Sequence, residues 1–394
     1  MTTDVYYDPY NREIALDPWP VFKRLRDEAP VYYNEQYDFY VLSRYDDVHR
    51  GLVDDPRLIS GRGTIPEIIR AYNGTKFPAG TFIFEDPPDH TVHRGLLSRV
   101  FTPKKMDALI PQIRAYCAGC LDPLIGSDGF DLVDALCTAM PMRVMGMLMG
   151  IPESMFDDVK EGADEFFTTE VGKPMKASVP RMEVIEEYLD WRAKRPSDDL
   201  VTMLLNTQFT DIDGTVRTIN RDEALSYLNL LAVAGNETTG RLISWIGKVF
   251  GEHPDQRREV AADPRLVANA VEEVLRFEPI SQRLARWSVE DVEYHGTTIP
   301  AGSIVVLLTA AANRDERHYD RPDVFDIHRN TAGLLSFGFG LHFCLGASLA
   351  RTEGRIALEE MLKRFPDWEV DHSGIELAVT SGARGWTKMP LRIG

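Results

Sequence analysis

The chain has 394 residues, 44% hydrophobic and 27% charged as in ordinary globular proteins, and is long enough to bury a large core without disulfides. Its formal net charge of −17 argues against a nucleic-acid-binding protein, which needs a basic face to neutralise phosphates. Residues 1–20 show no secretory signal and no apolar run of roughly 18 residues occurs, so with only four cysteines we expect a cytoplasmic protein without a membrane anchor.

Helical patterns dominate the chain, and β-rich segments lie towards its two ends. Residues 17–30 have the pattern of a short helix that ends at Pro30, and residues 31–45 that of a β-hairpin around a polar break. Further strands are predicted within residues 291–311 and in the tail after residue 366.

An amphipathic helix is predicted over residues 105–125, where apolar residues recur at three- and four-residue spacing. Cys117 and Cys120 both fall on its apolar stripe, and no second C-x-x-C pair exists, so core packing is favoured over a zinc or redox site. Cys137 lies in another apolar run and has the same interpretation.

The longest helical pattern begins after Asn220, which with Glu223 forms a predicted capping box. Gly251 and Pro254 are its stop signals. A helix of about thirty residues spans roughly 45 Å. It is apolar around much of its circumference, so we expect it to cross the molecule through the core.

The middle of this helix, AGNETTG at 234–240, breaks the apolar pattern. Glycine costs about 1 kcal/mol relative to alanine inside a helix, and a buried Glu237 is expensive without a partner. One interpretation is a polar face turned to solvent. The other is a helix opened locally around a ligand, which the very apolar flanking residues favour.

The segment FGFGLHFCLG, residues 337–346, places Cys344 among glycines just before a predicted helix. Glycine permits positive φ and close approach of the backbone, and a helix N-terminus stabilises a thiolate. Core packing, a nucleophile and a metal ligand are the three possible roles of this thiol. His342 is not placed to act as its base, and no zinc cage is available, so a lone thiolate suits an iron held mainly by a porphyrin.

The segment resembles the haem-binding signature of the cytochrome P450 monooxygenases, F-x-x-G-x-x-x-C-x-G. AGNETT resembles the oxygen-activation motif of this family, EEVLRFEP its E-x-x-R motif, and DPPDHTVHR its haem-propionate segment. With weaker matches, these motifs span nearly the whole chain. The resemblance implies a mainly α cytochrome P450 fold, with a multihelical haem domain and a smaller β-rich N-terminal region. We expect one catalytic domain over 1–394, its β-rich part being roughly 30–60, 290–310 and the tail.

The resemblance also implies haem b as the cofactor, with Cys344 as the axial ligand of its iron; electron donation from the thiolate favours O–O cleavage. Phe337 is expected to shield the sulfur, and Gly338 to let the backbone pass close to the macrocycle. The residues expected to pair with the propionates are His90, Arg94, Arg286 and His342. A surface arginine is the alternative for Arg286, and a structural role is expected for the neighbouring His93.

In the family the E-x-x-R pair, here Glu273 and Arg276, is structural. The third partner of that pair is an arginine, where this sequence has Val324. Arg329 or His328 are the candidates to replace it, and the sequence leaves this choice open.

Thr238 and Glu237 are expected on the oxygen side, where a hydroxyl orients a proton and an acid relays it from solvent; Thr239 is the weaker candidate. Substrate contacts are expected from the variable segments of the family (residues 61–84, 163–172, 280–285 and 381–386) and from Leu230, Val233, Ala234 and Leu284. Their apolar character indicates a hydrophobic small molecule: a terpenoid, steroid, fatty acid or aromatic. A haem-thiolate sensor is the alternative, which would not need Glu237 and Thr238.

The expected reaction consumes O2 and two electrons. The chain shows no flavin or ferredoxin domain of its own, so we expect a separate ferredoxin and an NAD(P)H-dependent reductase as partners, and a monomer. A basic patch is expected to steer the acidic partner, with scattered solvated charges as the alternative. Its residues are Arg99, Lys104, Lys105, Arg351 and Arg355.

Overall fold

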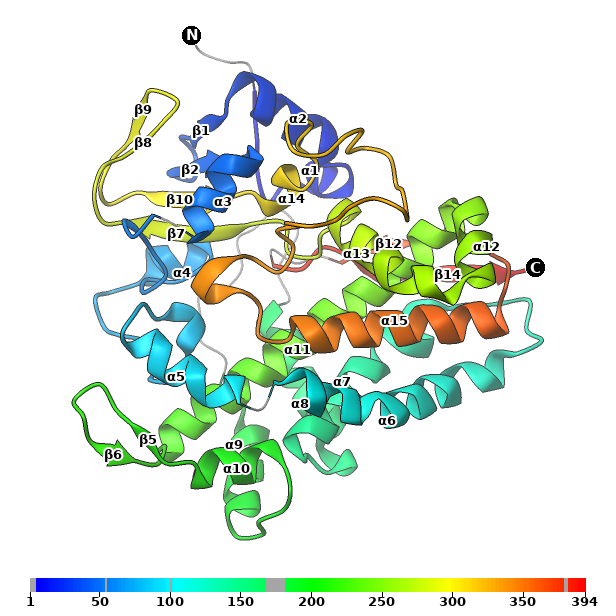
Figure 1. Ribbon diagram of the computed structural model, residues 1–394, viewed down its shortest axis with the longest axis horizontal. Coiled ribbons are helices and arrows are strands. Elements are labelled where there is room, and N and C mark those ends of the chain that lie inside the picture. Colours follow the sequence, from blue (N-terminus) through cyan, green and yellow to red (C-terminus); the bar gives the residue numbers. More distant parts are fainter. Residues whose placement is uncertain (1–4, 54, 100, 168–180, 379–381) are drawn as a thin grey trace.

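The computed structural model describes residues 5–394 except 54, 100, 168–180 and 379–381. Helices fill most of the molecule, and the largest sheet lies to one side with the N-terminal helices (Figure 1). The helices are α1 (Arg12–Leu16), α2 (Trp19–Glu28), α3 (Tyr45–Val53), α4 (Pro66–Ala71), α5 (Asp89–Ser98), α6 (Pro103–Leu121), α7 (Ala139–Met149), α8 (Phe156–Phe167), α9 (Glu183–Ala193), α10 (Leu200–Asn206), α11 (Arg221–Glu252), α12 (Pro254–Ala262), α13 (Val267–Phe277), α14 (Thr309–Ala312) and α15 (Ala347–Arg364).

The largest sheet has five strands in the order β1-β2-β10-β7-β3. Its strands are β1 (Val31–Asn34), β2 (Phe39–Leu42), β3 (Leu58–Ile59), β7 (Leu284–Ser288) and β10 (Ile304–Leu307). The predicted hairpin is confirmed by the antiparallel pairing of β1 and β2. Strand β10 pairs parallel with β2, so the two β-rich regions predicted far apart in sequence join in one sheet.

The remaining strands form small sheets. The tail strands β11 (Trp368–Val370) and β14 (Pro390–Ile393) pair with β4 (Gly129–Asp131). Three two-stranded pairs are β5 (Phe209–Thr210) with β6 (Val216–Arg217), β8 (Val292–Tyr294) with β9 (Thr297–Ile299), and β12 (Glu376–Leu377) with β13 (Trp386–Lys388). The predicted strands within 291–311 and after residue 366 are thus confirmed.

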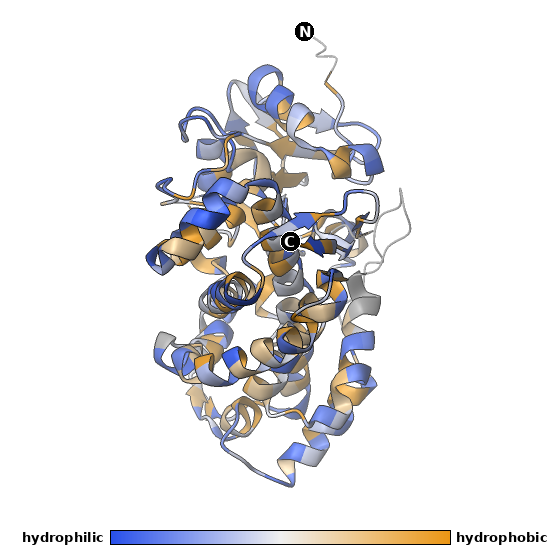
Figure 2. Cartoon of the chain, turned by 90° about the vertical axis from the view of Figure 1, so that its right-hand side faces the viewer, coloured by the Kyte–Doolittle hydropathy of each residue, from blue (hydrophilic) through white to orange (hydrophobic). Residues whose placement is uncertain are grey.

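Helix α11 contributes many residues to the largest hydrophobic core. The predicted capping box is present: the Asn220 side chain accepts from the Glu223 N–H, and the Glu223 carboxylate accepts from the Asn220 N–H. The helix passes through the middle of the molecule behind α15 (Figure 1) and is buried along most of its length. Figure 2 shows apolar residues gathered in the interior, with polar residues towards the outside. The prediction of a long buried helix is confirmed.

Two local predictions have instructive outcomes. Helix α2 ends at Glu28 rather than at Pro30, because the residue before a proline disfavours the helical conformation. Cys117 and Cys137 are buried in the core and Cys120 is half-buried against it, which confirms that they are packing residues. Burial raises the pKa of the Cys117 thiol to about 12.

No helix in the described part of the chain is both long and apolar enough to cross a membrane.

Candidate active site

The loop before α15 is shaped by two glycines in the left-handed region, Gly338 at φ 67° and Gly340 at φ 68°. A side chain at Gly340 would meet the Leu52 carbonyl oxygen at 2.9 Å, so only glycine fits this turn. The Cys344 N–H donates to the Phe337 carbonyl at 2.8 Å and closes the loop. The sequence therefore folds here into a rigid bend that presents one thiol.

Cys344 is exposed even though the surrounding protein desolvates its thiol. Burial raises the pKa of Cys344, while the backbone N–H groups of Gly346 and Ala347 and the charges of Arg94 and Arg351 oppose this shift. These N–H groups belong to the start of α15, as predicted for a thiolate at a helix N-terminus. In the described part of the chain, no group of three or more His, Cys, Asp or Glu residues is arranged to hold a metal ion.

Four nitrogen-bearing side chains from three separate segments gather beside this loop. His90 and Arg94 come from α5, Arg286 from β7 and His342 from the loop itself. The His90 and His342 rings have centroids 4.2 Å apart. Arg286 is only 3% exposed, so the alternative of a surface arginine is wrong.

The electrostatics of this cluster are unfavourable for positive charge. Burial, followed by the charges of Arg286, His90 and Arg94, lowers the pKa of His342 to about 2. Burial lowers the pKa of Arg286 to about 10, and it also lowers the pKa of His90. The Asp86 carboxylate, whose charge opposes the pKa shifts of Arg286 and His90, already accepts hydrogen bonds from the backbone N–H groups of residues 60 and 61. Such a cluster favours an added anion.

The middle of α11 presents one open face. Ala234 is exposed and Glu237 and Thr238 are half-buried, while Asn236 and Thr239 are buried. The interpretation of AGNETTG as a polar face turned to solvent therefore holds only in part, because Asn236 and Thr239 are buried. The Thr238 hydroxyl donates to the Ala234 carbonyl at 2.8 Å, the i−4 bond expected for a threonine inside a helix.

The prediction that α11 is locally opened is also wrong, since the helix runs without interruption from Arg221 to Glu252. The two glycines serve packing instead. A Cβ at Gly240 would lie 2.5 Å from the carbonyl oxygen of Cys137, in the short π-helix Val133–Cys137, and one at Gly235 would lie 2.6 Å from the Met145 sulfur of α7. Close approach of neighbouring elements explains the costly glycines.

Arg241 is a residue that the sequence reasoning missed. Its Nη2 donates to Glu237 Oε1 at 2.8 Å, one helical turn away, and the exposed fractions of the two side chains are 14% and 10%. The positive charge of Arg241 offsets the cost of placing the Glu237 carboxylate in the middle of α11. The i,i+4 spacing of a glutamate and an arginine was the available sequence signal.

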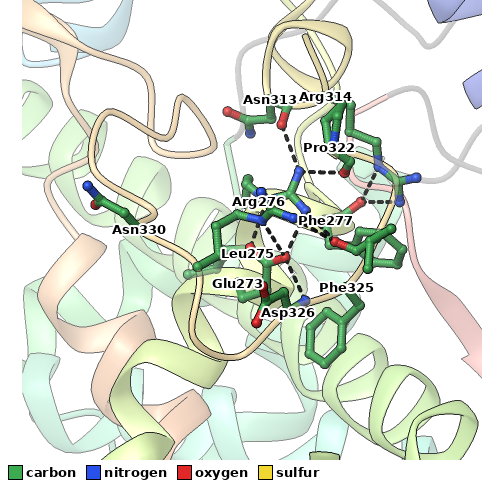
Figure 3. Close-up of polar contacts among 12 residues, drawn as sticks. Glu273, Leu275, Arg276, Phe277, Asn313, Arg314, Pro322, Phe325, Asp326 and Asn330 are labelled. Atoms are coloured by element: carbon green, nitrogen blue, oxygen red, sulfur yellow. Dashed lines mark hydrogen bonds and ion pairs between the residues drawn. The ribbon is translucent and has the colours of Figure 1, made fainter. Parts of the chain in front are cut away.

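Behind the cysteine loop, the fully buried Glu273 and Arg276 pair at 2.7 and 2.8 Å (Figure 3). Arg276 also donates to the carbonyls of Asn313 and Pro322. Arg329 Nε donates to Glu273 Oε1 at 3.1 Å, whereas His328 bonds Glu259 at an exposed position. Arg329 is therefore the third partner that the sequence left undecided.

Comparison with known proteins agrees with this geometry. The Cytochrome P450 family model matches residues 155–382. The chain is 34% identical to the putative cytochrome P450 123 of Mycobacterium tuberculosis, over 99% of this chain and 97% of that one. It is 36% identical to the vitamin D(3) 25-hydroxylase of Pseudonocardia autotrophica, with 98% and 96% covered. The chain belongs to the cytochrome P450 family.

Solved cytochrome P450 structures share its fold. CYP109Q5 from Chondromyces apiculatus superposes with a TM-score of 0.85 at 33% identity, covering 98% of each chain. P450BioI, solved with a fatty-acyl carrier protein, has a TM-score of 0.85 at 29% identity, covering 97% of this chain and 100% of that one. The predicted mainly α P450 fold is confirmed, and the protein is a P450 monooxygenase whose family cofactor is haem b.

The residues of this P450 fit that cofactor. Neither ring nitrogen of the buried His90 has a hydrogen-bond partner in the described part of the chain, although buried polar atoms are normally paired. His90 belongs to a cluster that favours an anion, and haem carries two propionate carboxylates. The cluster therefore suits the propionates. The exposed Cys344 thiol, in a bend closed by a backbone hydrogen bond, suits the iron.

The predicted substrate residues of this P450 differ in exposure. Ala234 is exposed and Leu284 half-buried, whereas Leu230 and Val233 are packed in the core beside α11. Part of the predicted segment 163–172 and the first residue of 381–386 lie outside the described residues.

Within the predicted basic patch, Arg99, Lys104 and Lys105 are exposed. Arg351 instead pairs with Glu272 at 2.5 Å and lies over the Phe337 ring, with 4.5 Å from its Cζ to the ring centroid. Arg355 donates to Thr352 on its own helix. The charge of Arg351 is thus already balanced within the protein.

Proposed function

We propose that this P450 uses O2 and two electrons to hydroxylate or epoxidise a hydrophobic small molecule. The proposal is supported by three features of the same chain: an exposed Cys344, a four-residue cluster that favours an anion, and the half-buried Glu237 and Thr238 in the middle of α11. A purely ligand-binding protein has no need of the last two groups.

The cofactor is held in this proposal by Cys344 as the iron ligand, with Phe337 and Gly338 forming the loop around the sulfur. His90, Arg94, Arg286 and His342 hold the propionates through charge-assisted hydrogen bonds. When bound, haem supplies the activation of O2 for oxygen transfer. The backbone N–H groups at the start of α15 stabilise the thiolate.

Thr238 and Glu237 are proposed to manage protons. The Thr238 Oγ1 donates to the Ala234 carbonyl, which leaves its lone pairs available to hold a water on the open face of α11. Glu237 is one residue away, near enough in sequence to pass a proton from solvent towards that water. The buried Thr239 has no such access.

The substrate is proposed to be hydrophobic, contacting Ala234, Leu284 and the margins of Leu230 and Val233. Similar proteins point the same way. The relatives include a vitamin D(3) hydroxylase, and the solved structures include a hexadecenoic acid-ligated acyl carrier protein complex and an erythromycin B complex. The proposed substrate is therefore a terpenoid, a steroid, a fatty acid or an aromatic compound. The whole chain is proposed to form one catalytic domain.

Electrons are proposed to come from a separate ferredoxin and its NAD(P)H-dependent reductase, with the P450 acting as a monomer. The exposed Arg99, Lys104 and Lys105 support an acidic partner, because they give a −17 protein a local positive surface.

A spectral binding screen tests the function. Compounds of the four classes are titrated into the ferric protein, and displacement of water from the iron is read as a Soret shift. A class that binds and is oxygenated with a reconstituted ferredoxin system supports the proposal. Binding without turnover by any class would contradict it in favour of a sensor. As a check on the ligand, reduced protein with CO is expected to show the red-shifted Soret band, which Cys344→Ser abolishes.

A further inference from the structure

Two residues of α11, Arg241 and Trp245, lie on the same stripe as the proposed proton-relay acid and contact the C-terminal loop, residues 382–386. Glu237, Arg241 and Trp245 follow one another at four-residue spacing, so they share a face of the helix. Arg241 bonds Glu237 Oε1 at 2.8 Å with one guanidinium nitrogen, Nη2. It uses its second terminal nitrogen, Nη1, to donate to the Trp386 carbonyl of the loop.

The loop is fitted closely to this stripe. A Cβ at Gly385 would lie 2.5 Å from Arg241 Cδ, so the loop backbone rests directly on the arginine stem. Trp245 Nε1 donates to the Arg384 carbonyl at 3.0 Å, and the Trp245 and Trp386 ring centroids are 5.3 Å apart. Residues 383–386 are buried. The loop therefore cannot shift without moving the guanidinium.

The same loop is joined to a segment that the sequence associates with substrate. The Arg384 N–H donates to the Ile280 carbonyl at 2.8 Å, at the start of 280–285. Its guanidinium pairs with Glu278 and donates to the carbonyl of Ala15 at 2.9 Å. Hydrogen bonds thus connect the start of residues 280–285, through the loop, to Arg241.

We propose that Arg241 is a positioning residue that couples the placement of the C-terminal loop to the orientation of the Glu237 carboxylate. This inference rests on the proposed proton role of Glu237. A planar guanidinium holds two acceptors in fixed directions, so displacement of Trp386 changes the bond to Glu237. Substrate that seats against the loop then sets the acid in position, and proton delivery follows substrate binding.

Hydrogen–deuterium exchange on the purified holoenzyme tests the coupling without turnover. Arg241→Met is expected to raise exchange in the peptide covering 382–388 by about fivefold, the effect of one lost hydrogen bond. Glu237→Gln, whose change lies outside the loop, is expected to raise the same exchange by about twofold because a charge-assisted bond becomes a neutral one. Unchanged loop exchange in Glu237→Gln would overturn the proposal.

Lys248→Met is the matched control. Lys248 lies 5.7 Å from the Trp386 ring centroid but pairs with Glu252 at 2.6 Å, so it borders the loop without contacting Glu237. Removal of the Lys248 amine is expected to leave two quantities unchanged. One is the exchange of the peptide covering 382–388, and the other is the amount of product formed per NAD(P)H. Loss of coupling equal to that of Arg241→Met would overturn a specific role for Arg241.

Product formed per NAD(P)H separates failure of this inference from failure of the proposed function. If Glu237→Gln leaves that ratio unchanged, the proton role itself is wrong. A second outcome is that Glu237→Gln lowers the ratio, whereas Arg241→Met changes neither the ratio nor the protection of the loop from exchange. In that case the proton role of Glu237 stands, and only the proposed link between the loop and Glu237 through Arg241 is wrong. A fall in both measurements for Arg241→Met, with partial recovery in Arg241→Lys, supports it.

Discussion

Arg329 Nε lies 3.1 Å from Oε1 of the fully buried Glu273, and the same guanidinium donates to the carbonyls of Arg321 and Val324 at 3.0 Å. It thus joins α13 to the chain segment before the cysteine loop. Glu273 Oε1 also accepts the Asp326 N–H at 3.1 Å (Figure 3). A buried carboxylate that loses one of these donors bears a desolvation cost.

We therefore expect Arg329→Met to lower the free energy of unfolding by about 3 kcal/mol, because it strips a cation from a buried ion network. Denaturant titration measures the change. The adjacent His328→Ala is the control: His328 and Glu259 are both about half exposed, and such pairs contribute about 0.5 kcal/mol or less. Equal losses from both variants would contradict the assignment of Arg329 as third partner.

Gly240→Ala is expected to destabilise the protein by about 2 kcal/mol, although alanine is the better helix former by about 1 kcal/mol. The new methyl group meets the Cys137 carbonyl oxygen, which is backbone and cannot move aside. Gly235→Ala is expected to cost less, since the obstructing Met145 side chain is flexible. Thermal unfolding of the two variants gives the order, and a stabilised Gly240→Ala would refute packing as the reason for this glycine.

His93 gives the protein a pH-dependent contribution to stability. Burial lowers the pKa of His93, but the hydrogen bond at 2.7 Å and the charge of Glu85, with Glu223 and Asp89 beyond, outweigh it and raise the pKa above its usual value. The contribution is therefore complete below the unfolded pKa of about 6.5 and is lost as pH rises through the folded pKa.

His93→Gln is accordingly expected to cost about 2 kcal/mol at pH 6, and less as the pH rises above about 6.5. Urea midpoints at a series of pH values measure the difference from wild type. His295→Gln serves as control, because its bond to Asp47 is at a more exposed position. A His93→Gln penalty that grows with pH would show that the histidine is held neutral.

Thr238→Ala is expected to lower product per NAD(P)H by about tenfold and to release peroxide, because the hydroxyl that orients the proton is lost. Thr239→Ala is the matched control from the next position: it is buried, so its loss affects packing more than coupling. Peroxide and product are quantified in the same reaction. Equal uncoupling in both variants would remove the specific role of Thr238.

Local pattern in the sequence was enough to predict several features. The capping box of Asn220 and Glu223, the packing role of Cys117 and the glycine bend before Cys344 each depend on residues within a few positions of one another. Short-range hydrogen bonds and steric limits act there whatever the rest of the chain does. The haem-binding signature of the family predicted the same bend, because it fixes the spacing between the glycines and Cys344.

The tertiary structure decided what local pattern leaves open. The sequence does not say which of the adjacent His328 and Arg329 points inward; the fold turns Arg329 to Glu273 and His328 to the surface. It also assigned the glycines of α11 to close packing rather than to an opened helix, and placed Arg241 between Glu237 and the C-terminal loop. Each outcome depends on which distant segment lies against a side chain, and only the packed molecule brings those segments together.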